Sequence, residues 1–267
     1  MKSNPVIVRP SVRARPRASQ RGVALFIVLV VVMLSMLLAL WASRTSLFSE
    51  MVVGNDVDYQ RAFEAAQALV QDAELDILSQ QADGTDCVSG GSGDVCRQAT
   101  TAKIPLETQD IAPLIIQLDN AGATKCLAAL CTRRMGRQDF WNNDGTITPA
   151  ADSSLGEATL ANMEIVGARY GQYTGASTGS TGAPINPILA ITGNATDQGG
   201  WYWIEVLPYN DSSVNSGVTI GNANAAESLA LYLVPNTVYR ITAVAFGRKP
   251  NTRVVLQSTY VQKKVMD

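Results

Sequence analysis

The 267-residue sequence contains no histidine. This absence removes the side chain most often used as a general base and the one most often used as a metal ligand. Only 16% of the residues are charged and only four are cysteines, none of them spaced as a CxxC pair. A zinc site is therefore disfavoured, and no convergent acid–base set can be identified. We expect a protein that is not an enzyme and that needs no metal or other cofactor.

Charge is missing altogether from residues 23–42, a run of 20 mostly aliphatic residues. As an α-helix this run would be about 30 Å long, which matches the hydrocarbon core of a bilayer. Its only hydroxyl belongs to Ser35, whereas a buried helix of a soluble protein normally carries a polar stripe. A cleaved secretory signal is disfavoured, because the run exceeds the usual length of about 7–15 residues and no small-x-small site follows. The run predicts one transmembrane helix within residues 23–43.

Residues 1–22 form a basic leader with six lysines and arginines and no acidic residue. The positive-inside rule keeps such a leader in the cytoplasm and exports the chain that follows the span. Without the leader, 15 basic and 23 acidic residues remain, a formal charge of −8. We expect a single-pass inner-membrane protein with a periplasmic C-terminal domain. An acidic domain of this kind disfavours nucleic acid as a partner.

Residues 44–79 continue the helix with an amphipathic pattern. Gly54–Asn55 is its one weak point, and no proline lies between Pro16 and Pro105, so we expect one helix from about 23 to about 79. The apolar positions recur at spacings of three and four: Tyr59, Ala62, Phe63, Ala66, Leu69, Val70, Ala73 and Ile77. The polar positions between them, which we assign to the other faces of the helix, are Asp58, Arg61, Glu64, Gln71, Asp72 and Glu74.

Residues 80–267 predict an exported globular domain of the α+β class. A Gly- and Ser-rich stretch ends the helix, and from about residue 163 the pattern becomes strand-like. We expect a long N-terminal helix, its first half transmembrane, packed on a C-terminal antiparallel β-sheet. The four expected strands are 163–170, 200–207, 237–246 and 252–262, with a hairpin loop at 247–251.

A basic residue and a glycine, Arg21 and Gly22, stand directly before the apolar run. This junction resembles the class III signal of type IV pilins. The Ala-rich segment 50–68 is similar to the N-terminal module of PilX-type minor pilins, and segments within 200–262 resemble that family's closing strands. The resemblance implies a pilin-like fold, cleavage by prepilin peptidase between Gly22 and Val23, and N-methylation of Val23. It covers residues 19–79 more closely than 200–262 and barely extends to the middle of the chain.

Two residues depart from the general pilin pattern. Val23 stands where most pilins have Phe or Met, and Ile27 stands where most have a glutamate that neutralises the amino terminus of a neighbouring subunit. PilX-type minor pilins and the tip pseudopilin of type II secretion also lack this glutamate. The resemblance therefore implies a minor pilin that primes type IV pilus assembly within a tip-located complex. Its implied partners are other minor pilins, the major pilin and a PilY-type tip adhesin.

Two alternatives from other classes remain. A tip pseudopilin of type II secretion usually carries a large helical insertion, which the strand-like sequence after 163 does not match. A pilus-associated adhesin or DNA-binding subunit is supported only by basic clusters, and which process the pilus serves stays open. The basic residues are Arg133, Arg134, Arg137, Arg248, Lys249, Arg253, Lys263 and Lys264.

The cysteines fall into two local pairs, Cys87 with Cys96 and Cys126 with Cys131. Because a bacterial periplasm is oxidising, we expect two local disulfides, with crossed pairing and free thiols as alternatives.

The acidic and amide residues of segment 139–144 raise the question of calcium. An EF-hand placed on Gly145 would need Phe140 and Ala151 as ligands, so we expect a turn. An irregular calcium site at Asp139–Asp144 is the alternative.

Overall fold

The computed structural model describes residues 21–87, 93–133, 138–143, 158–178, 186–193, 196–208 and 235–262. The chain divides into two compact units, Met1–Gly54 and Asn55–Asp267. Helix α1, Arg21–Leu78, begins in the first unit and ends in the second. It confirms the expectation of one long N-terminal helix, and Gly54–Asn55 does not interrupt it.

In the first unit, the described residues are those of α1 from Arg21 to Gly54. Two of its hydroxyl side chains bond within the helix: Ser35 donates to the carbonyl of Val32 at 2.8 Å, and Thr45 donates to that of Trp41 at 3.0 Å. Neither hydroxyl therefore needs water or a partner residue, which suits a helix in apolar surroundings.

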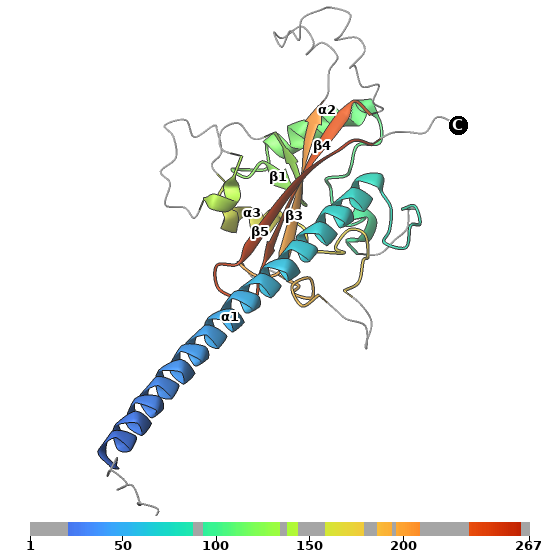
Figure 1. The fold of residues 1–267 in the computed structure, drawn as a ribbon. Helices are drawn as coiled ribbons and strands as arrows, with labels where there is room; N and C mark the ends of the chain where they lie inside the picture. The colour runs from blue at the N-terminus through green and yellow to red at the C-terminus, as the bar shows by residue number, and fades with distance from the viewer. Residues whose placement is uncertain are drawn as a thin grey trace, which may run out of the picture. The chain divides into compact units, whose positions relative to one another are not determined.

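The second unit is built on a five-stranded sheet with the order β1-β2-β3-β4-β5 (Figure 1). Pairing is antiparallel except between β2 and β3, which run parallel. The strands are β1 Cys126–Leu127, β2 Leu130–Thr132, β3 Gly200–Pro208, β4 Thr237–Phe246 and β5 Arg253–Tyr260. The helices beside α1 are α2 Thr108–Asp119 and α3 Leu160–Val166, with short 3₁₀ turns η1 Val95–Arg97 and η2 Phe140–Asn142.

One face of the sheet is covered by the part of α1 that follows Asn55. Small alanines at helical spacing let the helix backbone approach the strands, and Leu69 and Ile77 fill the remaining space at 0% exposure. Tyr202, Ile204 and Tyr239 face them from β3 and β4. The amphipathic pattern is thus the packing stripe of this helix on the sheet.

The opposite face of the sheet carries a second core, beneath α3 and η2. Trp201 and Trp203 point into it from alternate positions of β3 and are 3% and 0% exposed. The indole N–H of Trp203 donates to the carbonyl of Met163 at 2.8 Å, and Phe140 packs edge-on at 4.8 Å. The two tryptophans are therefore residues of the second core.

One of the four expected strands is absent. Residues 163–170 do not form a strand: Leu160–Val166 is helix α3, and only Ala168 bridges to β3. The side chain of Thr159 accepts a hydrogen bond from the backbone N–H of Asn162, and this cap starts a helix where alternation suggested a strand. The three other expected strands, β3, β4 and β5, pair antiparallel as expected. The sheet is extended by β1 and β2, strands of two and three residues that are too short to leave a pattern, and β2 runs parallel to β3.

Candidate functional site

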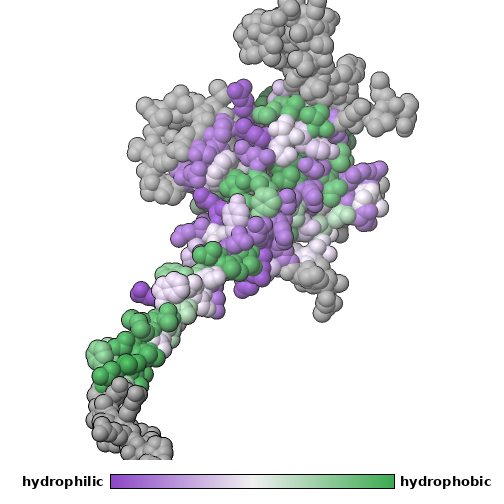
Figure 2. All heavy atoms as spheres, viewed as in Figure 1, coloured by the Kyte–Doolittle hydropathy of each residue, from purple (hydrophilic) through white to green (hydrophobic). Residues whose placement is uncertain are grey.

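From Val23 to Val53 the side chains of α1 are exposed, and most of them are apolar (Figure 2). α1 is the one helix of the described chain that is long and apolar enough to cross a membrane, judged by length and composition. Val23 is 62% exposed and Ile27 is 54% exposed. Residues Arg21–Val23, where cleavage is expected, form the first turn of the helix.

Large apolar side chains remain exposed beyond the expected span. Within a stretch of seven residues, Leu47, Phe48, Met51, Val52 and Val53 are 55–67% exposed. These side chains lie past Trp41 and Arg44 and point in several directions around the helix. A surface of this kind on one isolated helix is typical of a segment that is covered by a partner.

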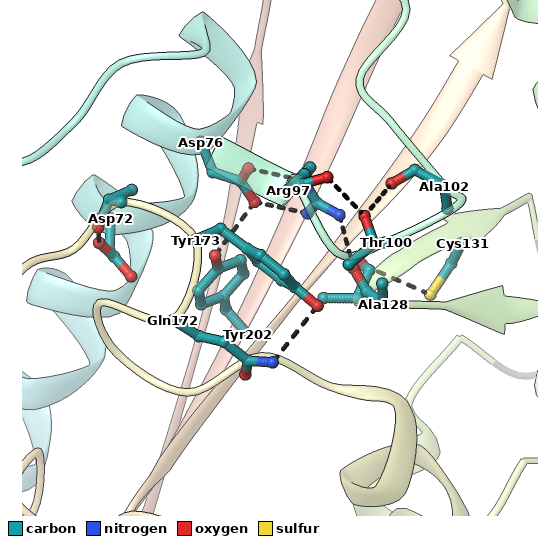
Figure 3. Close-up of polar contacts among 12 residues, drawn as sticks. Asp72, Asp76, Arg97, Thr100, Ala102, Ala128, Cys131, Gln172, Tyr173 and Tyr202 are labelled. Carbon is teal, nitrogen blue, oxygen red and sulfur yellow. Dashed lines mark hydrogen bonds and ion pairs between the residues drawn. The ribbon is translucent and has the colours of Figure 1, made fainter. Parts of the chain in front are cut away.

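A buried ion pair fastens the other end of α1 to the globular unit (Figure 3). Arg97 donates from Nε and Nη2 to the two carboxylate oxygens of Asp76 at 2.7 and 2.6 Å, and both residues are 4% exposed. Arg97 also donates to the carbonyl of Ala128 at 2.8 Å and lies 4.0 Å from the ring centre of Tyr173. The hydroxyl of Tyr202 donates to Asp76 at 3.1 Å. Burial alone lowers the Arg97 pKa, but the Asp76 carboxylate outweighs it and the net direction is upward.

One turn before Asp76, the buried carboxylate of Asp72 holds the loop at 171–174. It accepts the backbone N–H of Gly171 at 2.7 Å and a short hydrogen bond from the hydroxyl of Thr174. Gly171 adopts a φ of +73°, a conformation that favours glycine. Burial, opposed by these two hydrogen bonds, raises the Asp72 pKa to about 6.

The raised Asp72 pKa predicts that stability falls as pH rises. The native state binds this proton more tightly than the unfolded chain, whose pKa is near 3.8. The stabilisation is therefore complete below about pH 4 and is lost as pH passes through about 6, at a cost of about 1–3 kcal/mol. Denaturant unfolding between about pH 4 and 7 measures this slope for wild type and Asp72→Asn.

The variant should lack the part of the slope that Asp72 contributes. The buried Glu164, whose pKa burial raises to about 7, keeps its own contribution in both proteins and serves as the internal control. Identical slopes in wild type and variant would contradict the assignment to Asp72.

A third carboxylate on α1 holds the β4–β5 hairpin. Asp58 accepts the backbone N–H groups of Arg248 and Lys249 at 2.9 and 3.0 Å. Burial alone raises the Asp58 pKa, but these amides and the Thr252 hydroxyl bring it below its usual value. Asp58, Asp72 and Asp76 are all buried, so our assignment of Asp58 and Asp72 to polar faces of the helix is wrong.

Two disulfides flank the contacts of Arg97. The structure joins Cys87 to Cys96, the residue before Arg97, and joins Cys126 to Cys131 around Ala128, whose carbonyl Arg97 contacts. This is the local pairing that the sequence favours. One disulfide thus constrains the loop that carries Arg97, and the other constrains the loop that carries its acceptor Ala128.

The calcium alternative is only partly within the described residues. Asp139 precedes the 3₁₀ turn η2 and accepts a hydrogen bond from the side chain of Asn142 at 3.2 Å, while Asp144 lies outside the described residues. Across the described parts of the chain, no group of three or more acidic or cysteine side chains is placed to hold a metal ion.

The basic clusters are also only partly described. Arg248, Lys249 and Arg253 line an open cavity of about 980 Å³ at the β4–β5 hairpin. Lys249 donates to the Asn55 side chain at 2.8 Å and Arg253 to that of Asn142 at 3.1 Å, so two of these three side chains serve packing within the unit. Arg134, Arg137, Lys263 and Lys264 lie outside the described residues.

Sequence reasoning missed the pairing of Asp76 with Arg97. The available signal was that Asp72 and Asp76 flank Ala73 and Ile77 on the packing stripe of α1. Acidic residues on a buried stripe require hydrogen-bonding partners. The sequence did not indicate which of the distant arginines would supply one.

Comparison with known proteins identifies the family. Residues 21–70 match the PilX N-terminal family, and residues 94–262 match the family described as type IV pilus assembly protein PilX, C-terminal. No curated protein and no solved structure matches the chain at a significant level. The two matched regions cover α1 up to residue 70 and the globular unit from residue 94 to 262, including the hairpin strands β4 and β5. The chain belongs to the PilX family of type IV pilus assembly proteins, structural components of the pilus, and its exposed apolar helix fits a membrane-anchored pilin.

Proposed function

We propose that this chain is a minor pilin that primes pilus assembly from the inner membrane and stays at or near the tip. The observation that carries the proposal is the missing carboxylate on the exposed part of α1. From Val23 to Ser49 the helix has no acidic residue and a single charge, Arg44. A subunit without this carboxylate cannot neutralise the amino terminus of a neighbour in apolar surroundings. A first subunit, with none above it, does not need to.

Before assembly, the exposed helix keeps the subunit in the membrane, which serves as a reservoir of subunits. Residues 23–42 diffuse in the bilayer with the N-terminus in the cytoplasm, and assembly transfers them into a bundle of like helices. The exposed side chains between Leu47 and Val53 extend this contact surface beyond the bilayer. The globular unit, stabilised by disulfides that form in the oxidising periplasm, selects the partners. Other minor pilins, the major pilin and a PilY-type adhesin are the partners proposed.

Processing at the first turn of α1 is the first test. We expect prepilin peptidase to cleave between Gly22 and Val23 and the new amino terminus of Val23 to be methylated, leaving 245 residues. Intact-mass analysis of protein extracted from membranes measures both changes. Retention of the leader, or a cut beyond Ala42, would overturn the proposal.

Ile27→Glu tests the tip position. For a tip subunit no neighbour presents an ammonium to this carboxylate, so glutamate gains nothing and costs a few kcal/mol in lipid. We expect incorporation into sheared pili, relative to the major pilin, to stay level or fall. Ile27→Gln is the matched uncharged control. A clear rise with glutamate alone would contradict the tip position and leave membership of the pilin class intact.

The two alternatives are weaker. The described residues after Ala158 hold only one short helix, α3, and three long strands, whereas a tip pseudopilin of type II secretion carries a large helical insertion. An adhesin or DNA-binding role would use Arg248, Lys249 and Arg253, and two of these already contact Asn55 and Asn142.

A further inference from the structure

Strand β5 forms one edge of the sheet, and its outer side is unpaired among the described residues. β5 pairs with β4 over eight consecutive residues, from Arg253 to Tyr260. The described chain places no strand beyond it, and no backbone or side-chain hydrogen bond within that part of the chain reaches its outer N–H and C=O groups. An edge of eight residues is about 26 Å long.

The pairing pattern shows which amides point outward. The N–H of Ile204 in β3 donates to Ala129, away from β4, so Ile204 and its partner Ile241 form a non-hydrogen-bonded pair. Along a strand, the backbone N–H and C=O groups of successive residues point alternately toward one neighbouring strand and the other. The N–H and C=O of Ile241 therefore point toward Ser258 of β5. The residues of β5 that bond to β4 are thus the even-numbered ones. The outward N–H and C=O groups belong to the odd-numbered ones: Arg253, Val255, Gln257 and Thr259.

This edge lacks the features that normally block edge-to-edge association. Natural edge strands carry proline, an inward charge or a bulge, or are very short. The segment from Val254 to Tyr260 contains no proline and no charged residue, and its register with β4 is continuous, without a bulge. An edge this long and this regular is suited to receive another strand.

Three side chains of β5, those of Val255, Leu256 and Tyr260, are apolar or aromatic and only half-buried. Leu256 and Tyr260 pack partly against the core beneath α1, and Val255 packs partly against the core on the opposite face. An added strand would cover these side chains on both faces of the sheet, in addition to bonding the outward amides.

A second copy of this chain does not fit the edge. Two identical β5 strands pair antiparallel about a two-fold axis perpendicular to the sheet. α1 lies on the face of the sheet, so this axis would make the two α1 helices antiparallel. The proposed function places the α1 helices of neighbouring subunits parallel in one bundle, and this antiparallel arrangement does not fit such a bundle.

We propose that the outer edge of β5 binds an extended segment of a different protein of the pilus assembly, which adds a sixth strand to the sheet. Backbone hydrogen bonds to Val255, Gln257 and Thr259 hold the segment. Its residues alternate, with apolar side chains at every second position to lie beside Leu256 and Tyr260. Because the edge from Val254 to Tyr260 is uncharged, the segment that pairs with it is also largely uncharged. The inference rests on the proposed function, in that it requires assembly with other pilus proteins.

Hydrogen exchange at single-residue resolution tests the proposal. The full processed chain is compared in detergent by itself and in the assembled form recovered with the other pilus proteins through an affinity tag. The outward amides of Val255, Gln257 and Thr259 should exchange at least about 100-fold more slowly in the assembled form. The amides of Leu256 and Tyr260, which bond to β4, should be protected in both.

The other possible outcomes contradict either the strand addition or the proposed function. If the outward amides are equally unprotected in both forms, the strand addition is wrong. If they are protected in the isolated chain, a segment of the chain itself occupies the edge and the proposal is also wrong. Failure to recover the chain with any pilus protein would instead overturn the proposed function.

Gln257→Pro provides the matching variant, with Gln257→Ala as its control. Proline removes an outward N–H without removing a bond to β4, and Gln257 is exposed, so the fold should persist. We expect proline to reduce co-recovery of the partner about tenfold or more and alanine to leave it unchanged. If Gln257→Pro melts earlier than wild type, Thr259→Pro is the replacement. Proline variants that fold and still recover the partner at the wild-type level would overturn the proposal.

Discussion

Replacing Asp76 with alanine is expected to lower the free energy of unfolding by about 3–5 kcal/mol. Arg97 is 4% exposed and makes two hydrogen bonds to this carboxylate, so the variant leaves its charge buried, with the Ala128 carbonyl as its remaining acceptor among the described residues. The hydroxyl of Tyr202 loses its acceptor as well. Tryptophan fluorescence during denaturant unfolding of the full chain in detergent measures the change, because Trp201 and Trp203 are buried.

The chain offers a matched control in an exposed pair. Lys125 and Asp119 lie 3.6 Å apart with side chains 28% and 47% exposed, so Asp119→Ala should cost less than about 1 kcal/mol. The double variant Asp76→Leu with Arg97→Met should recover part of the loss, since it removes both buried charges together. A cost for Asp76→Ala no larger than that for Asp119→Ala would contradict the buried pair.

Introducing lysine at Val52 is expected to remove most of this subunit from assembled pili. Val52 is 67% exposed, so the fold of the isolated chain should not change, and it lies ten residues past the end of the apolar run, so insertion should persist. In a bundle of helices the lysine would be buried without a partner. Even about 1.4 kcal/mol lost at this contact lowers the affinity tenfold. The measurement is the amount of this chain in sheared pili relative to the major pilin.

Gln60→Lys is the control for charge and helix position. Gln60 is also exposed and also lies on α1, but it is polar and belongs to the second unit. Wild-type incorporation of Gln60→Lys together with loss of Val52→Lys would assign the effect to the apolar surface. If both variants are incorporated at the wild-type level, residues around Val52 make no contact in the pilus.

The elements with long periodic patterns could be predicted from the sequence. α1 was expected at 23–79 and lies at Arg21–Leu78, and β4 was expected and observed at Thr237–Phe246. In both, many residues repeat one period, so single exceptions such as Gly54 do not change the result. Short elements gave no such repetition. Residues 163–170 were expected to form a strand, but the cap at Thr159 starts helix α3, which ends at Val166.

The buried polar contacts could not be predicted for a different reason. Asp72 and Asp76 are polar, and on an amphipathic helix polar residues are ordinarily assigned to the solvent. Their burial depends on Thr174, Gly171 and Arg97, which lie between 21 and 102 residues away in the sequence. Contacts over such separations are set by the packing of the loops on α1, which local pattern does not encode.

By itself, the sequence determined the properties that depend on composition and period: an apolar run long enough to span a bilayer, a basic leader before it, one continuous helix, and the motifs that resemble PilX-type pilins. Only the tertiary structure decided which carboxylates of α1 are buried and which strand of the sheet is left with an open edge. The physical reason is that burial and pairing belong to two segments at once. The outward amides of Val255, Gln257 and Thr259 become recognisable only when the register of β5 against β4 is known.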